Sequence, residues 1–93
     1  MNSNENWELQ VRDKVFKALN KLQSKDRQRL AGIIEGLPSD PYRGDIEKLE
    51  GEEREWRRRS GAFRIFYEIK ELERIIYVFR VERRRSKTYM KRQ

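Results

Sequence analysis

Residues 54–81 read REWRRRSGAFRIFYEIKELERIIYVFRV, and this stretch decides the fold. Aromatic and β-branched side chains, which favour strands, dominate two of its runs, and a third run is strongly charged. Two short turns separate the three strand candidates. In chain order, the strands and turns are residues 54–60, 61–62, 63–70, 71–73 and 74–81. Three strands joined by tight turns predict an antiparallel meander.

The sequence before the meander predicts a strand and two helices. Trp7, Leu9 and Val11 alternate with polar residues, which predicts a strand over residues 6–11. A first helix over residues 12–22 has its apolar face at Val15, Phe16, Leu19 and Leu22. A second helix, with Ser24 as N-cap, has its apolar face at Leu30, Ile33, Ile34 and Leu37, and it ends at Pro38-Ser39-Asp40-Pro41.

These elements predict an α+β fold. An N-terminal strand and a two-helix hairpin precede an antiparallel meander of three to four strands, and the helices pack on one face of the sheet. The fourth strand would lie around Leu49, within residues 45–51, where the pattern is ambiguous. The opposite face of the sheet would carry arginines.

Composition excludes several kinds of chemistry. The chain has 93 residues, which predicts a single domain over 1–93. It contains no cysteine and no histidine, which excludes disulfides, thiolate nucleophiles and histidine general bases. Acidic residues are scattered and no glycine-rich phosphate loop is present, so we expect neither a metal nor a cofactor. No apolar run is long enough to span a membrane and no signal peptide is visible, which predicts a cytoplasmic protein.

The net charge of +7 lies entirely in the second half of the chain. Residues 51–93 carry 14 Lys/Arg against 7 Asp/Glu, whereas residues 1–50 are balanced. The tail, residues 82–93, carries six basic residues against one glutamate. Such one-sidedness favours a polyanionic partner, namely nucleic acid, an acidic protein or an anionic membrane.

Arginines on the predicted strands are candidates for phosphate binding. In a strand, Arg57 and Arg59 point to one face while Trp56 and Arg58 point to the other, and Arg64 joins one of these faces from the next strand. Guanidinium groups bind phosphate bidentately, so such a row would form a phosphate track. The alternative interpretation is an edge strand protected by charge.

Aromatic residues have two interpretations. Tyr89 lies in the basic tail, where it would stack on a base, transfer a proton or anchor the tail on the core. The five aromatic residues of the meander are interpreted as core rather than as a stacking platform. They are Phe63, Phe66, Tyr67, Tyr77 and Phe79.

The pattern as a whole resembles the RelE/ParE family of toxins from toxin–antitoxin systems. The resemblance spans Trp7 to Tyr89 and includes Lys48-Leu49-Glu50-Gly51 and the run from Trp56 to Tyr67, which is similar to the family's W-R-x-R-x-G-x-Y-R-x-x-Y stretch with Phe63 in place of tyrosine. Arg83, Arg85, Ser86 and Tyr89 match the Arg-x-Arg-Ser-x-x-Tyr pattern of the RelE-like branch.

The resemblance implies a ribosome-dependent endoribonuclease that cuts mRNA in the A site by attack of a 2′-OH, with a cognate antitoxin as partner. It implies Arg64, Arg83 and Tyr89 as catalytic residues. It also implies an RNA-binding set of Arg57, Arg59, Arg85, Ser86 and Lys87. An antitoxin would present an acidic or amphipathic helical segment.

Two other functions stay open. ParE-like members poison DNA gyrase and lack the RNA-cutting residues, so a gyrase inhibitor is one alternative. A non-catalytic basic module that binds nucleic acid is the other, and it gains support from Glu55, which stands where the family often has a lysine. The general base is not identified by the sequence.

Overall fold

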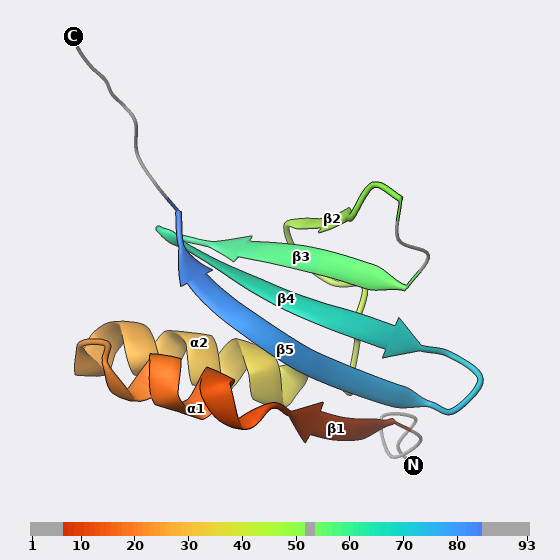
Figure 1. The fold of residues 1–93 in the computed structure, drawn as a ribbon, viewed down its shortest axis with the longest axis horizontal. Helices are drawn as coiled ribbons and strands as arrows, with labels where there is room; N and C mark the ends of the chain where they lie inside the picture. The colour runs from red at the N-terminus through yellow and green to blue at the C-terminus, as the bar shows by residue number, and fades with distance from the viewer. Residues whose placement is uncertain (1–6, 52–53, 85–93) are drawn as a thin grey trace, which may run out of the picture.

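The fold is a five-stranded sheet with two helices on one side (Figure 1). The computed structural model describes residues 7–51 and 54–84. In chain order, the elements are β1 (Glu8–Val11), α1 (Asp13–Asn20), α2 (Ser24–Gly36), β2 (Ile46–Lys48), β3 (Glu55–Ser60), β4 (Phe63–Lys70) and β5 (Ile75–Arg83). The predicted α+β fold and the order of its elements are confirmed.

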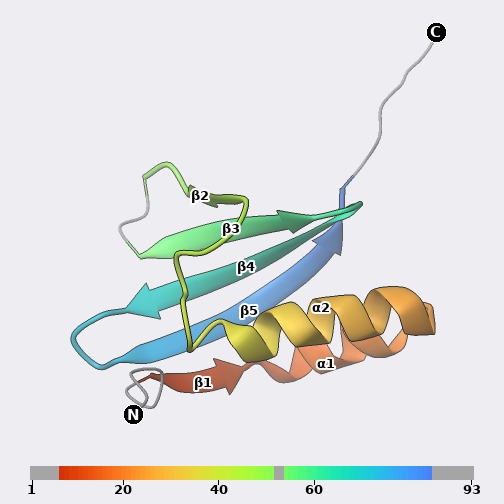
Figure 2. The same cartoon turned by 180° about the vertical axis from the view of Figure 1, so that it is seen from behind.

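The sheet is mixed rather than wholly antiparallel. Its strand order is β1-β5-β4-β3-β2, and the pairs from β2 to β5 form the predicted antiparallel meander. The first strand, β1, pairs in parallel with β5. In the chain, both helices come between β1 and the other strands, so no hairpin fixes its direction, and β1 lies beside β5 at one edge of the sheet (Figure 2).

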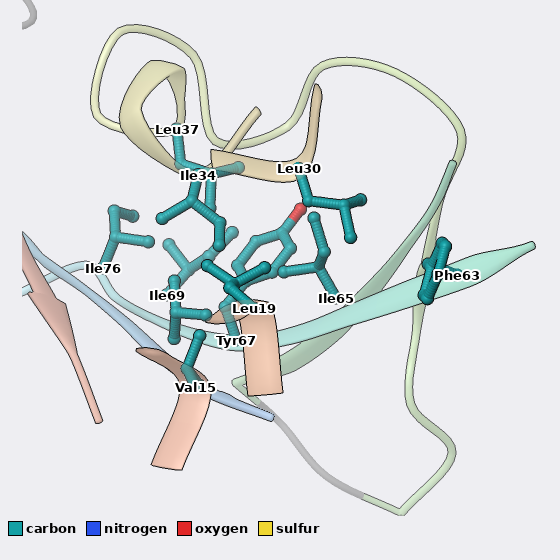
Figure 3. Close-up of a cluster of buried hydrophobic side chains, with 11 residues drawn as sticks. Val15, Leu19, Leu30, Ile34, Leu37, Phe63, Ile65, Tyr67, Ile69 and Ile76 are labelled. Atoms are coloured by element: carbon teal, nitrogen blue, oxygen red, sulfur yellow. The ribbon is translucent and has the colours of Figure 1, made fainter. Parts of the chain in front are cut away.

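One apolar core fills the space between the helices and the sheet (Figure 3). The residues that form it are Val15, Leu19, Leu30, Ile34, Leu37, Phe63, Ile65, Tyr67, Ile69, Ile76 and Val78. Tyr67 is wholly buried, and its hydroxyl donates a hydrogen bond of 3.0 Å to the carbonyl oxygen of Pro41. This bond ties the loop after α2 to the centre of the sheet and satisfies the buried hydroxyl.

Two details of the helices differ from the prediction. Ser24 is the first residue of α2 rather than its N-cap, and its hydroxyl accepts a hydrogen bond from the Gln28 amide. Phe16 is 52% exposed although it was assigned to the apolar face of the first helix. The face of α1 that meets the sheet is narrower, with Val15 and Leu19 at its centre.

A β-bulge changes which residues of β5 face the core. Phe66 pairs with Arg80, whereas its neighbour Tyr67 pairs with Val78, so Phe79 is an extra residue in β5. Ile76 and Val78 therefore face the helices. A regular alternation that places Val81 against the core would place Tyr77 there too, but the extra residue reverses the faces, and Tyr77 lies on the opposite side.

None of the helices in the described part of the chain is long and apolar enough to cross a membrane.

Candidate nucleic-acid interface

The face of the sheet opposite the helices, here called the open face, carries the arginines. Two rows of paired residues cross β3, β4 and β5 on this face. One row consists of Arg57, Phe66 and Arg80, and the other of Arg59, Arg64 and Glu82. We call the four arginines of these rows the arginine patch.

This register confirms the prediction that alternate residues of β3 lie on opposite faces of the sheet. Arg57 and Arg59 lie on the open face together with Arg64. Trp56 lies on the other face, where it packs against the core. Arg58 also lies there, and its guanidinium donates a hydrogen bond of 3.3 Å to the carbonyl oxygen of Arg43. Two neighbouring arginines of one strand thus have different surroundings.

Carboxylates neutralise part of the arginine patch. The Arg57 guanidinium donates a hydrogen bond to Glu47 from β2, and this bond, together with the charge of Arg57, holds the pKa of the Glu47 carboxyl below its usual range. Arg59 Nε lies 3.6 Å from a carboxylate oxygen of Asp45. Glu82 lies between Arg64 and Arg80. One of its oxygens is 3.7 Å from the Arg64 guanidinium, and the other is 3.7 Å from the Arg80 guanidinium.

Two donors in the patch have no acceptor among the described residues. The Nε–H groups of Arg57 and Arg64 are buried and unpaired. A buried donor without a partner costs free energy comparable to a lost hydrogen bond. These Nε atoms are covered, so an oxyanion placed over the patch would accept from the partly exposed outer nitrogens of the same guanidinium groups, whose side chains are 24% exposed for Arg57 and 29% for Arg64.

Aromatic rings lie among these cations on the open face. The Arg80 guanidinium carbon is 4.3 Å from the ring centroid of Phe66, and Phe66 is 6.3 Å from Phe79. The series continues through Tyr77, whose ring is 6.2 Å from Phe79 and 5.5 Å from the ammonium of Lys70. The interpretation of Tyr77 and Phe79 as core is therefore wrong, and Phe66 is buried beneath Arg80 rather than beneath the helices.

Arg83 lies on a different side from the arginine patch. It is the last residue of β5 and pairs with Phe63, whose side chain belongs to the core face. Its guanidinium carbon is 4.7 Å from the Phe63 ring centroid, and the residue is exposed. Glu82 and Arg83, predicted as the start of the tail, belong to the strand. At the end of β5, Glu82 thus lies on the open face, whereas Arg83 lies on the other side of the sheet.

The other predicted tail residues lie outside the described residues. These are Arg85, Ser86, Lys87 and Tyr89.

The two tyrosines with shifted pKa values are not acids or bases at neutral pH. Burial raises the pKa of Tyr67 to about 12. Burial, together with its hydrogen bond to Glu71, raises the pKa of Tyr42 to about 12. Tyr67 faces the core, and Tyr42 packs edge-on against Trp56 at 5.6 Å on that same side of the sheet.

Comparison with known proteins identifies the family. The sequence profile described as ParE toxin of the type II toxin–antitoxin system parDE matches residues 6–88. This chain belongs to the RelE/ParE toxin family. RelE1 of Methanocaldococcus jannaschii, a protein named as a toxin, is 28% identical over 81 residues, which cover 84% of this chain and 90% of RelE1.

Solved RelE structures share the fold of this RelE/ParE chain. The RelE–RelB complex of Pyrococcus horikoshii aligns with a TM-score of 0.74 and 24% identity, over 85% of this chain and 96% of that one. The isolated RelE toxin of E. coli aligns with a TM-score of 0.73 and 18% identity, over 87% of each chain. The arrangement of helices, sheet and open face is thus that of RelE toxins.

Arg80, Phe66 and Glu82 belong to this interface but were not predicted as site residues. Arg80 and Glu82 share one face with Arg64 and Phe66 in regular register, and the bulge changes the faces only on the other side of Phe79. A signal for Glu82 was present, because it is the single acidic residue of the tail.

Proposed function

We propose that this RelE/ParE toxin is a ribosome-dependent endoribonuclease that cuts mRNA in the A site. The observation that carries the proposal is the arginine patch, four guanidinium groups gathered on a face that also carries aromatic rings. A phosphate would accept from the exposed parts of these guanidinium groups, and bases would stack on the rings. In this proposal the open face binds the message.

The arginines would stabilise the transition state. Attack of a 2′-oxygen on the adjacent phosphorus breaks the bond to the 5′-oxygen and builds negative charge on the phosphoryl oxygens. Arg64 and Arg57 supply fixed positive charge where that charge develops. Arg83 would contact the phosphate backbone where the RNA passes the end of β5. Tyr89 would protonate the leaving 5′-oxygen, and Arg59, Arg85, Ser86 and Lys87 would bind flanking phosphates.

Dependence on the ribosome fits the composition of the chain. Without histidine, the protein has no side chain whose ordinary pKa is close to 7. Holding the 2′-oxygen, the phosphorus and the leaving oxygen in line supplies much of the rate enhancement in such reactions. A ribosome that orients the message would contribute this part, and it would place the toxin in the cytoplasm.

A cognate antitoxin is the proposed partner when the toxin is inactive. RelE proteins of Pyrococcus horikoshii, Mycobacterium tuberculosis and E. coli have been solved in complexes with RelB or as RelBE complexes. An acidic or amphipathic helical segment would complement the arginine patch. Covering these charges would block the message.

Primer extension on translating ribosomes tests the activity. Purified toxin is added to ribosomes on a defined message, and new 5′ ends are mapped. An Arg83→Ala variant and a reaction without ribosomes run alongside. Cuts that need the ribosome and weaken in the variant support the proposal, whereas a folded toxin that produces no cuts overturns it.

Inhibition of DNA gyrase is the second candidate function, because the matching family profile is that of ParE. In that case the open face would bind a protein or DNA and catalyse nothing. A supercoiling assay with purified gyrase separates the two functions. Loss of supercoiling without RNA cleavage would favour the gyrase function, and unchanged supercoiling at saturating toxin would exclude it.

A further inference from the structure

We propose that Glu82 is the general base that removes the proton from the attacking 2′-OH. This assignment rests on the proposed endoribonuclease function and names the group that the sequence left unidentified. It follows from the position of Glu82 in the arginine patch and from the proton chemistry of the open face.

Few side chains on the open face can accept a proton from the 2′-OH. Guanidinium groups stay protonated up to a pKa of about 12 or more, so the arginines of the patch cannot accept a proton. Lys70 is six residues along β4 from Arg64, roughly 20 Å away at the usual rise of a strand. The remaining acceptors among the described residues are carboxylates. On the open face these are Glu8, Glu47, Glu55, Glu68 and Glu82, and Asp45 reaches Arg59 from the loop before β2.

Position separates Glu82 from the other carboxylates. Glu8 lies on the edge strand β1, and Glu55 and Glu68 face each other toward the far end of the sheet. Glu68 is four residues from Arg64, roughly 13 Å along β4, and it pairs with Lys70 at 3.8 Å. Glu47 belongs to β2 at the opposite edge, and its side chain is 62% exposed. Asp45 precedes β2 at that same edge, its side chain is 66% exposed, and its ion pair is with Arg59 rather than with Arg64.

Glu82 lies within the patch itself. It pairs directly with Arg64 across β4 and β5, and each of its two oxygens lies 3.7 Å from a different arginine. A phosphate that bound Arg64 would therefore have this carboxylate as an immediate neighbour. The 2′-OH of the same nucleotide would come within hydrogen-bonding reach, as a general base requires.

The proton and bond changes balance in this scheme. The 2′-O–H proton moves to a Glu82 oxygen while the 2′-oxygen forms a bond to phosphorus. The bond from phosphorus to the 5′-oxygen breaks, and the leaving oxygen is protonated, with solvent as the net source of that proton. The products are a 2′,3′-cyclic phosphate and a 5′-hydroxyl end. Glu82 then gives its proton to solvent, so no other reactant is consumed.

The test separates catalysis from binding with Glu82→Gln, which keeps the size of the side chain and an acceptor oxygen. Single-turnover cutting is measured on ribosomes with a defined message. Affinity is measured on the same complex with a 2′-deoxy nucleotide at the cut site, which cannot react. Glu68→Gln, on the same face but outside the patch, is the matched control.

We expect Glu82→Gln to cut at least about 10²-fold more slowly than wild type, as for loss of a general base. Its affinity for the 2′-deoxy complex should be equal or tighter, because a negative charge leaves the patch. Glu82→Asp should retain part of the rate, and Glu68→Gln should retain all of it.

Cutting by Glu82→Gln at the wild-type rate or faster would overturn the assignment, since the carboxylate would then only hold or screen the arginines. A loss of affinity by the same factor as the loss of rate would overturn it as well. Failure of the wild-type toxin to cut at all is a different result, because it overturns the proposed function together with this assignment.

Discussion

The two faces of the sheet are built from the same strands and serve different purposes. In β4, Ile65 is wholly buried against the helices, whereas its neighbour Arg64 contributes to the arginine patch. The core face is apolar and supports the fold. On the open face, two arginine Nε–H groups have no partner among the described residues, which costs stability. Alternation along a strand thus places core contacts and the proposed RNA contacts on neighbouring residues.

The sharpest way to test that separation begins with Arg64. Replacing Arg64 with alanine should lower single-turnover cutting by about 10²–10³-fold, because one donor to the developing charge is lost. The melting temperature should hardly change, since no core contact is removed. Cutting assays and thermal unfolding of the same preparation check both parts. A variant that unfolds but cuts normally when folded would reverse the roles of the faces.

The neighbouring residue should show the opposite behaviour. Ile65→Ala removes a wholly buried side chain, and we expect a loss of roughly 3 kcal/mol in the free energy of unfolding. Urea unfolding measures this loss. At a temperature where the variant is folded, its affinity for RNA should equal that of wild type. A reduced affinity there would mean that the core face takes part in binding.

The buried hydroxyl of Tyr67 gives the core face a pH dependence. Its pKa is raised to about 12, above the ordinary value near 10, because burial disfavours the ionised form. The associated stability is complete below pH 10 and is lost as the pH rises through 12. Between pH 9 and 12, wild type should lose about 2 kcal/mol more than Tyr67→Phe. Urea unfolding across this range measures the difference, and parallel curves for the two proteins would contradict it.

The smallest expected effect concerns Gly44 in the loop before β2. Its φ of 92° is unfavourable for other residues, and an added Cβ would lie 2.6 Å from the guanidinium carbon of Arg58. Gly44→Ala should cost about 1 kcal/mol of unfolding free energy. Since Arg58 lies on the face away from the arginine patch, cutting should not change. Reduced cutting at full folding would show that the change at Gly44 displaces its neighbour Asp45 and, through it, Arg59 of the patch.

Most of the fold could be predicted because helices, strands and tight turns each depend on residues that are close together in the sequence. The turn at residues 61–62 and the run from Phe63 to Lys70 place β4 and its core face, and the structure confirms both. The parallel pairing of β1 could not be predicted in this way, because it depends on contact between the two ends of the chain. The predicted N-cap of α2 was wrong by one residue. Gln23 precedes the helix, and Ser24, which was expected there, is its first residue.

The interface was predicted less well than the fold. Arg57, Arg59 and Arg64 share the open face, as simple alternation in β3 and β4 indicates. The bulge at Phe79 defeated the same reasoning in β5 and concealed the position of the Tyr77 ring on the open face. A bulge depends on how two strands pair, so the sequence of one strand does not reveal it. The roles of Arg83, Arg85, Ser86, Lys87 and Tyr89 stay predictions.

The central claim is that the open face, and not the helix-covered face, acts on RNA. Arg57 and Arg58 test it most directly, because they are neighbours of one residue type on opposite faces of β3. Each is replaced by alanine, and ribosome-dependent cutting is mapped by primer extension per folded molecule. We expect Arg57→Ala to cut at least about 10-fold more slowly and Arg58→Ala to match wild type. Equal losses in both variants, or a loss in Arg58→Ala alone, would contradict the account.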